Sequence, residues 1–139
     1  MNTARVLILC TGNSARSQMA EGLLRHLAGG RYEVFSAGTH PSFVRTEAIA
    51  VMRELGINIS GHRSKSVDEF RTQAFDYVIT VCDNARESCP VFPGNVRRIH
   101  WSFEDPAAAV GDEAARLAAF RRIRDQIADR LRDFVQAAA

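Results

Sequence analysis

No hydrophobic run in this sequence is long enough to cross a membrane. The longest run near the start, Val6–Cys10, falls far short of the roughly 20 apolar residues that a bilayer requires. Residues 1–3 also lack the character of a signal peptide. We therefore expect a cytoplasmic protein without a membrane partner.

The sequence also has no large excess of positive or negative charge. The 139 residues include 18 lysines and arginines against 16 aspartates and glutamates, which gives a formal net charge of +2. The basic residues, all arginine except Lys65, are scattered along the chain among acidic ones, whereas nucleic-acid-binding proteins gather them on one face. We therefore expect no nucleic-acid partner.

Cysteine is scarce, and its number is odd. Three cysteines, Cys10, Cys82 and Cys89, cannot form a closed disulfide framework, and structural disulfides are rare in the reducing cytoplasm. They are therefore buried apolar residues, metal ligands or reactive thiols. The spacing of Cys82 and Cys89 is not the CxxC type of zinc sites, which disfavours zinc binding by this pair with His100. We expect no metal.

Motifs for the common redox cofactors are also absent. The sequence contains no Rossmann fingerprint, no flavin motif and no haem-attachment sequence. We expect no cofactor. If the protein transfers electrons, its thiols are the only evident donors.

Alternating strand and helix patterns predict an α/β fold. The β-branched and aliphatic run over residues 5–10 is typical of a strand buried on both faces of a parallel sheet. Further strands are predicted over residues 32–36, 75–82 and 96–101. Apolar residues at helical spacing predict helices over residues 19–27, 48–55 and 117–134. We expect one domain of residues 1–139, a three-layer sandwich in which helices flank a four-stranded parallel sheet.

Three reactive side chains follow the carboxyl ends of predicted strands. Cys10 ends the first strand, Cys82 ends the third, and Asp105 lies just beyond the fourth. Ligands of open parallel sheets bind outside the carboxyl ends of the strands. We therefore expect these three side chains to lie at one edge of the sheet.

The segment after the first strand has the length of an oxyanion-binding loop. Five residues separate Cys10 from Arg16, and Ser17 follows. Such a loop directs backbone N–H groups at a tetrahedral oxyanion, the following helix adds positive potential, and arginine supplies a bidentate fork. The same field stabilises a thiolate, to which Ser17 can donate a hydrogen bond. The alternative is that Cys10 is a small buried hydrophobic residue and Arg16 a solvated one, but the position between a strand and a helix favours the oxyanion site.

The segment CTGNSARS, with Asp105-Pro106 late in the chain, resembles the low-molecular-weight protein tyrosine phosphatase fold family. Within it, Cys82 and Cys89 resemble the redox pair of the thioredoxin-coupled arsenate reductases. The resemblance extends over essentially the whole chain, including the segment VITVCDNARESCPVFP and the tryptophan before Asp105-Pro106. It implies a four-stranded parallel sheet flanked by helices.

The resemblance also implies a role for each residue of the motif. Cys10 is the expected nucleophile and Asp105 the expected general acid, while Asn13 braces the loop. The residues expected to bind the oxyanion follow Cys10 directly in the sequence and are Thr11, Gly12, Asn13, Ser14, Ala15, Arg16 and Ser17.

The activity implied by the resemblance is the reduction of arsenate to arsenite, for arsenic detoxification, by a three-cysteine relay. Cys10 attacks arsenic while Asp105 protonates the departing oxygen. Cys82 then attacks the Cys10 sulfur and arsenite leaves, after which Cys89 displaces Cys10 from the mixed disulfide. An external dithiol, thioredoxin or alternatively glutaredoxin, reduces the resulting Cys82 to Cys89 disulfide. We expect a monomer that also binds phosphate or sulfate as analogues.

Two other functions compete with this interpretation. A phosphatase of the same fold would hydrolyse phosphomonoesters through a phosphorylated Cys10, and weak phosphatase activity is expected in any case because phosphate and arsenate share geometry and charge. A phosphatase, however, has no use for Cys82 and Cys89. A non-enzymatic module that binds an oxyanion or a phosphopeptide would leave both Cys10 and Asp105 unexplained.

Two positions depart from the family's pattern. Some relatives hold a potassium ion beside the loop with a carboxylate near the position of Lys65. A lysine at this position either supplies the positive charge itself or lies solvated at the surface. Tyrosine phosphatases of the family often carry aromatic residues after the Asp-Pro pair, whereas this chain has Ala107-Ala108-Ala109. No role is assigned to His26, His40 or His62.

The spacing of Cys82 and Cys89 makes a physical prediction. A short helix is predicted from residue 84 to 88, with Asp83 as its N-cap and Pro90 discouraging its continuation. Helical rise would separate the two cysteine Cα atoms by about 10 Å, whereas a disulfide requires about 4.4 to 6.8 Å. The helix must therefore unwind or loop out when the disulfide forms.

Overall fold

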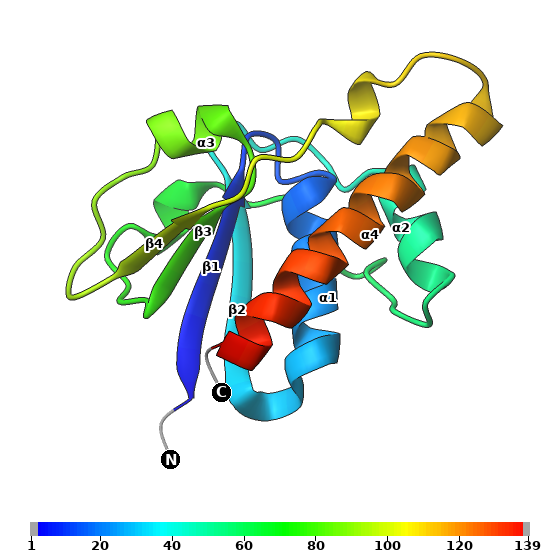
Figure 1. Cartoon of the computed structure of the whole chain (residues 1–139). Helices are drawn as coiled ribbons and strands as arrows, with labels where there is room; N and C mark the ends of the chain where they lie inside the picture. The colour runs from blue at the N-terminus through cyan, green and yellow to red at the C-terminus, as the bar shows by residue number, and fades with distance from the viewer. Residues whose placement is uncertain (1–2, 138–139) are drawn as a thin grey trace.

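A four-stranded parallel sheet forms the centre of the computed structural model, which describes residues 3–137 (Figure 1). Its strands, in the spatial order β2-β1-β3-β4, are β1 (Ala4–Cys10), β2 (Tyr32–Gly38), β3 (Tyr77–Thr80) and β4 (Arg97–His100). The α-helices are α1 (Arg16–Ala28), α2 (Thr46–Arg53), α3 (Asp83–Glu87) and α4 (Glu113–Ala137). Three short 3-10 helices complete the described elements: η1 (Gly29–Arg31), η2 (Val67–Phe70) and η3 (Pro106–Ala108).

Strand β1 lies at the centre of the sheet, as its continuous apolar run predicts. Its residues from Val6 to Leu9 are fully buried. It pairs with β2 from Ala4 opposite Tyr32 to Cys10 opposite Gly38. The strand predicted over residues 75–82 is shorter in the structure, where β3 spans Tyr77–Thr80, although the Val81 N–H still donates to the Leu9 carbonyl.

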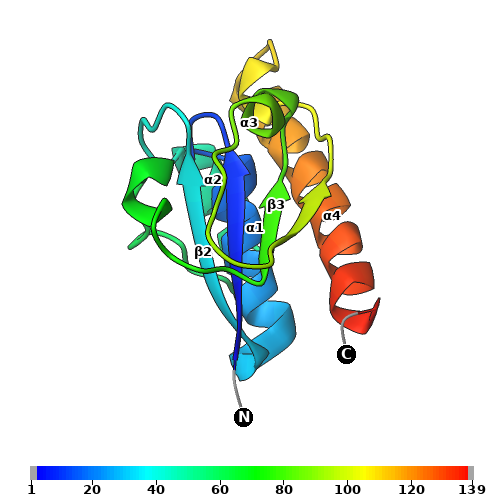
Figure 2. The same cartoon turned by 90° about the vertical axis from the view of Figure 1, so that its left-hand side faces the viewer.

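The two faces of the sheet are covered by different layers. On one face Tyr32 and Tyr77 pack against Phe134 of α4, with ring centroids 5.7 and 5.0 Å apart, and α1 and α2 lie on the same side (Figure 1). On the other face Phe35 packs against Phe70 of η2 at 5.7 Å, and loops extend this layer (Figure 2). The predicted three-layer α/β sandwich is confirmed, and its second outer layer consists largely of loops.

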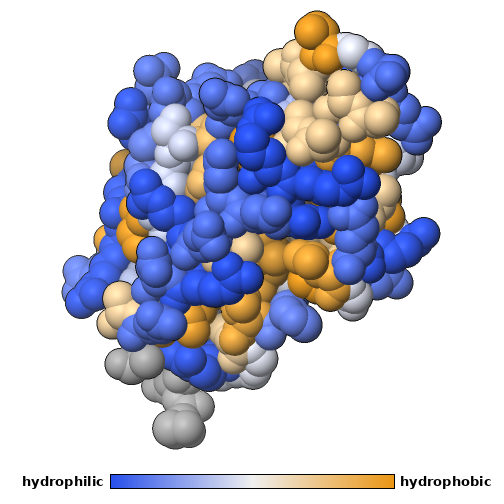
Figure 3. All heavy atoms as spheres, turned by 45° about the vertical axis from the view of Figure 1, so that its right-hand side comes forward, coloured by the Kyte–Doolittle hydropathy of each residue, from blue (hydrophilic) through white to orange (hydrophobic). Residues whose placement is uncertain are grey.

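The surface is mixed in polarity. On the face shown in Figure 3, hydrophilic residues predominate and hydrophobic surface is divided among separate patches. Phe43, Val91 and Val110 are among the exposed large apolar side chains. Within residues 3–137, no helix has the length and hydrophobicity needed to cross a membrane.

Candidate active site

A cavity lies at the carboxyl edge of the sheet, beside the loop that follows β1. Strand β2 lies on one side of β1 and β3 on the other, and such a switch point opens a crevice in a parallel sheet. The cavity has a volume of about 210 Å3. Its lining comes from the β1–α1 loop, the β2–α2 loop and the segment after β4: Cys10, Thr11, Gly12, Ser14, Ala15, Arg16, Ser42, Arg45, Asp105 and Ala107. Cys10 and Asp105 thus share one cavity.

The loop after β1 is held in shape by a left-handed residue and a close backbone approach. Asn13 has φ of 46°, a conformation that asparagine tolerates better than most residues. Its buried side-chain amide donates hydrogen bonds to Ser17 Oγ at 2.7 Å and Ser36 Oγ at 2.9 Å. A Cβ atom at Gly38 would lie 2.4 Å from the Thr11 carbonyl oxygen, so only glycine fits beside the loop.

Two hydrogen-bond donors meet the Cys10 sulfur. The Asn13 backbone N–H donates to Sγ at 3.2 Å, and Ser17 Oγ lies 2.8 Å from Sγ. Because the Ser17 hydroxyl already accepts a hydrogen bond from the Asn13 amide, its own proton is available for the sulfur. Both contacts stabilise a thiolate. The side chains of Asn13 and Ser17 are fully buried behind the cavity and are not part of its lining.

Arg16 and Asp105 face each other across the cavity. Arg16 Nη1 donates to the Phe103 carbonyl at 3.0 Å, and Nη2 lies 4.0 Å from Asp105 Oδ2. The other oxygen of Asp105 accepts the Ala107 N–H at 3.0 Å and so caps η3. This cap orients a half-exposed carboxylate toward the cavity, where a general acid would have to lie.

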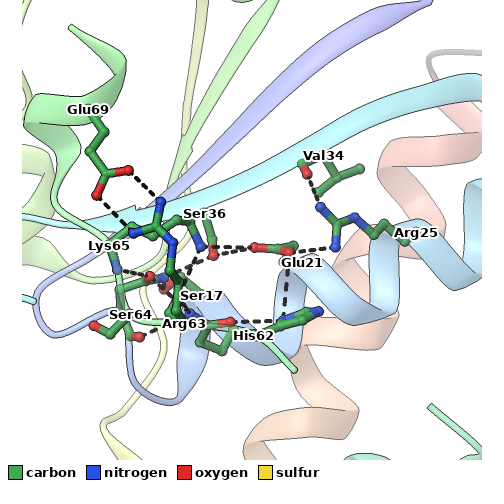
Figure 4. A network of polar contacts seen from close by, with 12 residues as sticks. Ser17, Glu21, Arg25, Val34, Ser36, His62, Arg63, Ser64, Lys65 and Glu69 are labelled. Atoms are coloured by element: carbon green, nitrogen blue, oxygen red, sulfur yellow. Dashed lines mark hydrogen bonds and ion pairs between the residues drawn. The ribbon is translucent and has the colours of Figure 1, made fainter. Parts of the chain in front are cut away.

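A buried carboxylate network supports the loop from behind (Figure 4). Glu21, on α1, accepts a hydrogen bond from Ser36, which also receives the Asn13 amide. Its carboxylate forms a 2.7 Å ion pair with Arg25 and lies 3.8 Å from Lys65 Nζ. The network therefore links Glu21 to the residues that contact the Cys10 sulfur.

Lys65 belongs to this network, so the alternative that its side chain lies solvated at the surface is wrong. Its side chain is 13% exposed, and its backbone N–H donates to Asn13 Oδ1 at 2.9 Å. Burial lowers the pKa of the Lys65 ammonium, while the Glu21 carboxylate acts in the opposite direction. Burial likewise lowers the pKa of His62, which lies 3.6 Å from Glu21.

These residues do not fit a potassium ion. The Glu21 carboxylate is already surrounded by an ammonium group, a guanidinium group and an imidazole ring. Potassium needs oxygen donors, and a second cation beside the lysine would be repelled. Among the described residues, no group of three or more histidine, cysteine, aspartate or glutamate side chains is placed to hold a metal ion.

Replacing Lys65 with methionine should destabilise the protein by about 1–3 kcal/mol, because Glu21 stays buried with one cation fewer. Urea unfolding measures the difference. Arg63→Met is the matched control: Arg63 pairs with Glu69 at the surface, and its loss should cost less. If Lys65→Met is as stable as the parent protein, then Arg25 and Ser36 alone satisfy the Glu21 carboxylate.

The Cys82 thiol lies next to the loop. Its Sγ is 3.3 Å from Thr11 Oγ1, which also accepts a hydrogen bond from the Asn84 side chain at 3.1 Å. Since Cys10 and Thr11 are consecutive, Cys82 contacts the residue that follows Cys10. Cys82 is 5% exposed.

Cys89 lies in a different cavity. That cavity, of about 160 Å3, is formed by β3, α3 and β4 and is lined by Val78, Thr80, Arg86, Cys89, Arg98, Ile99 and His100. Arg98 donates to Cys89 Sγ at 3.3 Å and to the Pro90 carbonyl at 3.0 Å. Burial raises the pKa of the Cys89 thiol, and Arg98 partly offsets this effect. All three cysteines are free thiols.

The predicted capping role of Asp83 is wrong. Cys82 occupies the N-cap position without a side-chain cap, and Asp83 is the first residue of α3. Its carboxylate instead accepts a hydrogen bond from His100 Nε2 at 2.9 Å, because β4 brings the imidazole alongside α3. This hydrogen bond lowers the pKa of Asp83.

Sequence reasoning did not single out several residues that surround the site. Glu21 had a detectable signal: Ser17, Glu21 and Arg25 recur every four residues and share the face of α1 that starts at the loop. Arg98 and Arg45 had no such signal in the sequence. Arg98 contacts Cys89 of another segment, and the Arg45 side chain has no hydrogen-bond partner among the described residues.

Comparison with known proteins identifies the fold family. Residues 5–139 match the family model described as low molecular weight phosphotyrosine protein phosphatase. An arsenate reductase of Halalkalibacterium halodurans is 43% identical over 136 residues, which are 98% of each chain.

Solved structures agree with this match. A structure described as an arsenate reductase in oxidized state is 32% identical, with a TM-score of 0.84 over 99% of this chain and 100% of that chain. A thioredoxin-dependent arsenate reductase of Corynebacterium glutamicum is 32% identical, with a TM-score of 0.74 over 99% of this chain and 64% of that chain. The resemblance inferred from the sequence motifs is confirmed, and the chain belongs to the low molecular weight phosphotyrosine protein phosphatase family.

Proposed function

We propose that the protein is an arsenate reductase in which Cys10 is the nucleophile. One observation carries this proposal: Cys10, Arg16 and Asp105 line one cavity, and a second thiol, Cys82, contacts the loop beside it. A hydrolytic phosphatase needs only the first three groups. The names of the similar relatives support the same activity.

The first step forms a bond between Cys10 and arsenic. Arsenate is held by the backbone N–H groups of the loop and by the Arg16 guanidinium. The Cys10 thiolate attacks As(V), Asp105 gives a proton to one arsenate oxygen, and that oxygen leaves as water. Ser17 and the Asn13 N–H stabilise the thiolate before the attack.

The second step transfers two electrons. The Cys82 thiolate attacks Cys10 Sγ, a disulfide forms, and the electron pair of the sulfur–arsenic bond stays on arsenic, which leaves as arsenite. Cys89 then attacks Cys82 Sγ and expels Cys10 as a thiolate. An external dithiol reduces the Cys82 to Cys89 disulfide and completes the cycle.

Thioredoxin is the proposed reductant, because one similar structure is described as a thioredoxin-dependent enzyme. The test is arsenate-dependent NADPH consumption with purified thioredoxin and thioredoxin reductase, compared with glutaredoxin, glutathione and glutathione reductase. We expect turnover with the thioredoxin system and none with the glutaredoxin system. If neither system supports turnover, the reductase proposal fails.

A weak phosphatase activity is proposed alongside reduction. Phosphate and arsenate are both tetrahedral oxyanions, so a phosphomonoester can enter the same cavity and phosphorylate Cys10. The segment after Asp105 offers alanine side chains, at Ala107 and its two successors, where an aromatic ring would find little to stack on. Hydrolysis of para-nitrophenyl phosphate should therefore be slow.

Replacing Asp105 with asparagine should lower the turnover number by about 10² to 10⁴-fold, the usual contribution of general acid catalysis. The amide keeps the size of the side chain and can still accept the Ala107 N–H that caps η3. Single-turnover kinetics with arsenate isolates the chemical step. Glu104→Gln, at the neighbouring exposed carboxylate, is the control and should react at the normal rate. A change under about threefold in Asp105→Asn would argue against the proton transfer.

A further inference from the structure

The oxyanion cavity contains a second arginine, Arg45. It directly precedes α2, and its backbone N–H donates to the Ser14 carbonyl at 2.9 Å, which joins this residue to the loop. Arg45 lines the same cavity as Cys10, Arg16 and Asp105. Two guanidinium groups therefore border the space in which the oxyanion would bind.

The Arg45 side chain has no hydrogen-bond acceptor among residues 3–137, whereas that of Arg16 donates to the Phe103 carbonyl. Arg45 Nε is buried and is the one buried side-chain nitrogen or oxygen atom without a hydrogen-bond partner within residues 3–137. None of the ion pairs in this part of the chain includes it. The nearby carboxylate of Glu47 is instead paired with Arg116 at 2.8 Å. A buried donor without an acceptor is unusual, and an anion bound in the cavity would supply one.

The position of the Arg45 side chain is supported by Phe43. The guanidinium carbon lies 5.5 Å from the centroid of the Phe43 ring, within the range of a cation–π contact. This contact restrains the side chain without using its N–H groups. The donors of Arg45 thus remain available for an anion in the cavity.

A second cation in the cavity balances the charge of the ligand. In the proposed mechanism a Cys10 thiolate and a doubly charged oxyanion lie beside Arg16, while Asp105 acts as the proton donor. Arg16 alone would leave most of this negative charge uncompensated. Arg45 adds a second guanidinium charge at the same cavity.

We propose that Arg45 is a second oxyanion-binding residue, which favours doubly charged tetrahedral anions over singly charged ones. This role rests on the proposed function, because it assumes that the oxyanion binds beside Cys10. In that position Arg16 binds one side of the anion, and Arg45 binds it from the β2–α2 loop.

The test measures binding rather than turnover. In a Cys10→Ser background, which removes the thiolate charge, isothermal titration calorimetry gives the affinity for inorganic phosphate. Arg45→Asn should weaken phosphate binding by about 10- to 100-fold, the loss expected for a charge-assisted hydrogen bond. Arg53→Asn removes the same charge from the exposed end of α2 and should change the affinity less than about twofold.

Anion charge is tested with two tetrahedral probes. Arg45→Asn should weaken the binding of sulfate, a dianion, more than that of perchlorate, a monoanion. Arg45→Lys keeps the charge but loses the fork, so its affinities should lie between those of Arg45→Asn and the parent. In the enzyme with Cys10 intact, Arg45→Asn should raise the KM for arsenate more than it lowers kcat.

Two outcomes would contradict the proposals, and they can be told apart. If Arg45→Asn and Arg53→Asn bind phosphate equally well, Arg45 does not contact the oxyanion and the inference is overturned. If the Cys10→Ser protein with Arg45 intact binds no phosphate, the oxyanion cavity of the proposed function fails as a whole. Circular dichroism and thermal unfolding of each variant ensure that a lost affinity reflects the site and not the fold.

Discussion

Replacing Cys10 with serine should abolish arsenate reduction and phosphomonoester hydrolysis together, with a loss of at least about 10³-fold in turnover. Among the described residues, Cys10 is the only cysteine that lines the oxyanion cavity. A serine hydroxyl is not ionised near neutral pH, and it cannot enter a disulfide. Arsenate-dependent NADPH consumption and para-nitrophenyl phosphate hydrolysis measure the two activities.

The loss should be confined to the chemistry. Cys10 is 2% exposed and serine is slightly smaller, so the Cys10→Ser protein should keep its fold and its phosphate binding. Ser17→Ala provides a graded comparison: it removes one donor to the sulfur and should slow both reactions by roughly 10- to 100-fold. Appreciable turnover by Cys10→Ser would mean that another group attacks the oxyanion.

The parts of the fold that local patterns determine were predictable from the sequence. The apolar run of β1 marked the central strand, and the spacing from Cys10 to Arg16 marked a loop that opens a helix. The parallel topology then placed Cys10, Cys82 and Asp105 at one edge, because the strands end there.

Contacts between distant segments were not predictable in this way. The Asp83 carboxylate, which was expected to cap α3, accepts a hydrogen bond from His100 instead. This contact depends on how β4 packs beside the helix. Cys89 lines a second cavity, in which Arg98 of β4 donates a hydrogen bond to its sulfur. The burial of Lys65 depends on Glu21, which is 44 residues earlier in the chain, and no local pattern encodes that distance.

The separation of the three thiols has a consequence for the relay. Cys82 contacts Thr11 beside the proposed nucleophile, whereas Cys89 follows the other end of α3 and accepts a hydrogen bond from Arg98. Helix α3 lies between the two cysteines, so the Cys82 to Cys89 disulfide requires its five residues to move. Two contacts anchor α3, Asp83 to His100 and Asn84 to Thr11, and we expect them to break when the helix moves.

Replacing either Cys82 or Cys89 with serine should stop arsenate reduction after at most one turnover while sparing phosphatase activity. Without Cys82, the arsenic adduct on Cys10 has no adjacent thiol to reduce it, because Cys89 lies in a separate cavity. Without Cys89, Cys82 still reacts, and the protein stops as a Cys10 to Cys82 disulfide. Ser88→Ala, next to Cys89, is the control and should turn over normally, because Ser88 is exposed.

Mass spectrometry and hydrogen exchange distinguish the oxidised species. Peptide mapping of the parent protein after arsenate treatment should show a Cys82 to Cys89 bond, and of Cys89→Ser a Cys10 to Cys82 bond. Amide exchange within α3 should be faster in the oxidised parent than in the reduced one, because the helix has opened. Cys89→Ser should keep the slow exchange after oxidation, since its disulfide does not span the helix. If either serine variant reduces arsenate through many turnovers with thioredoxin, the relay is wrong and the two extra thiols have another role.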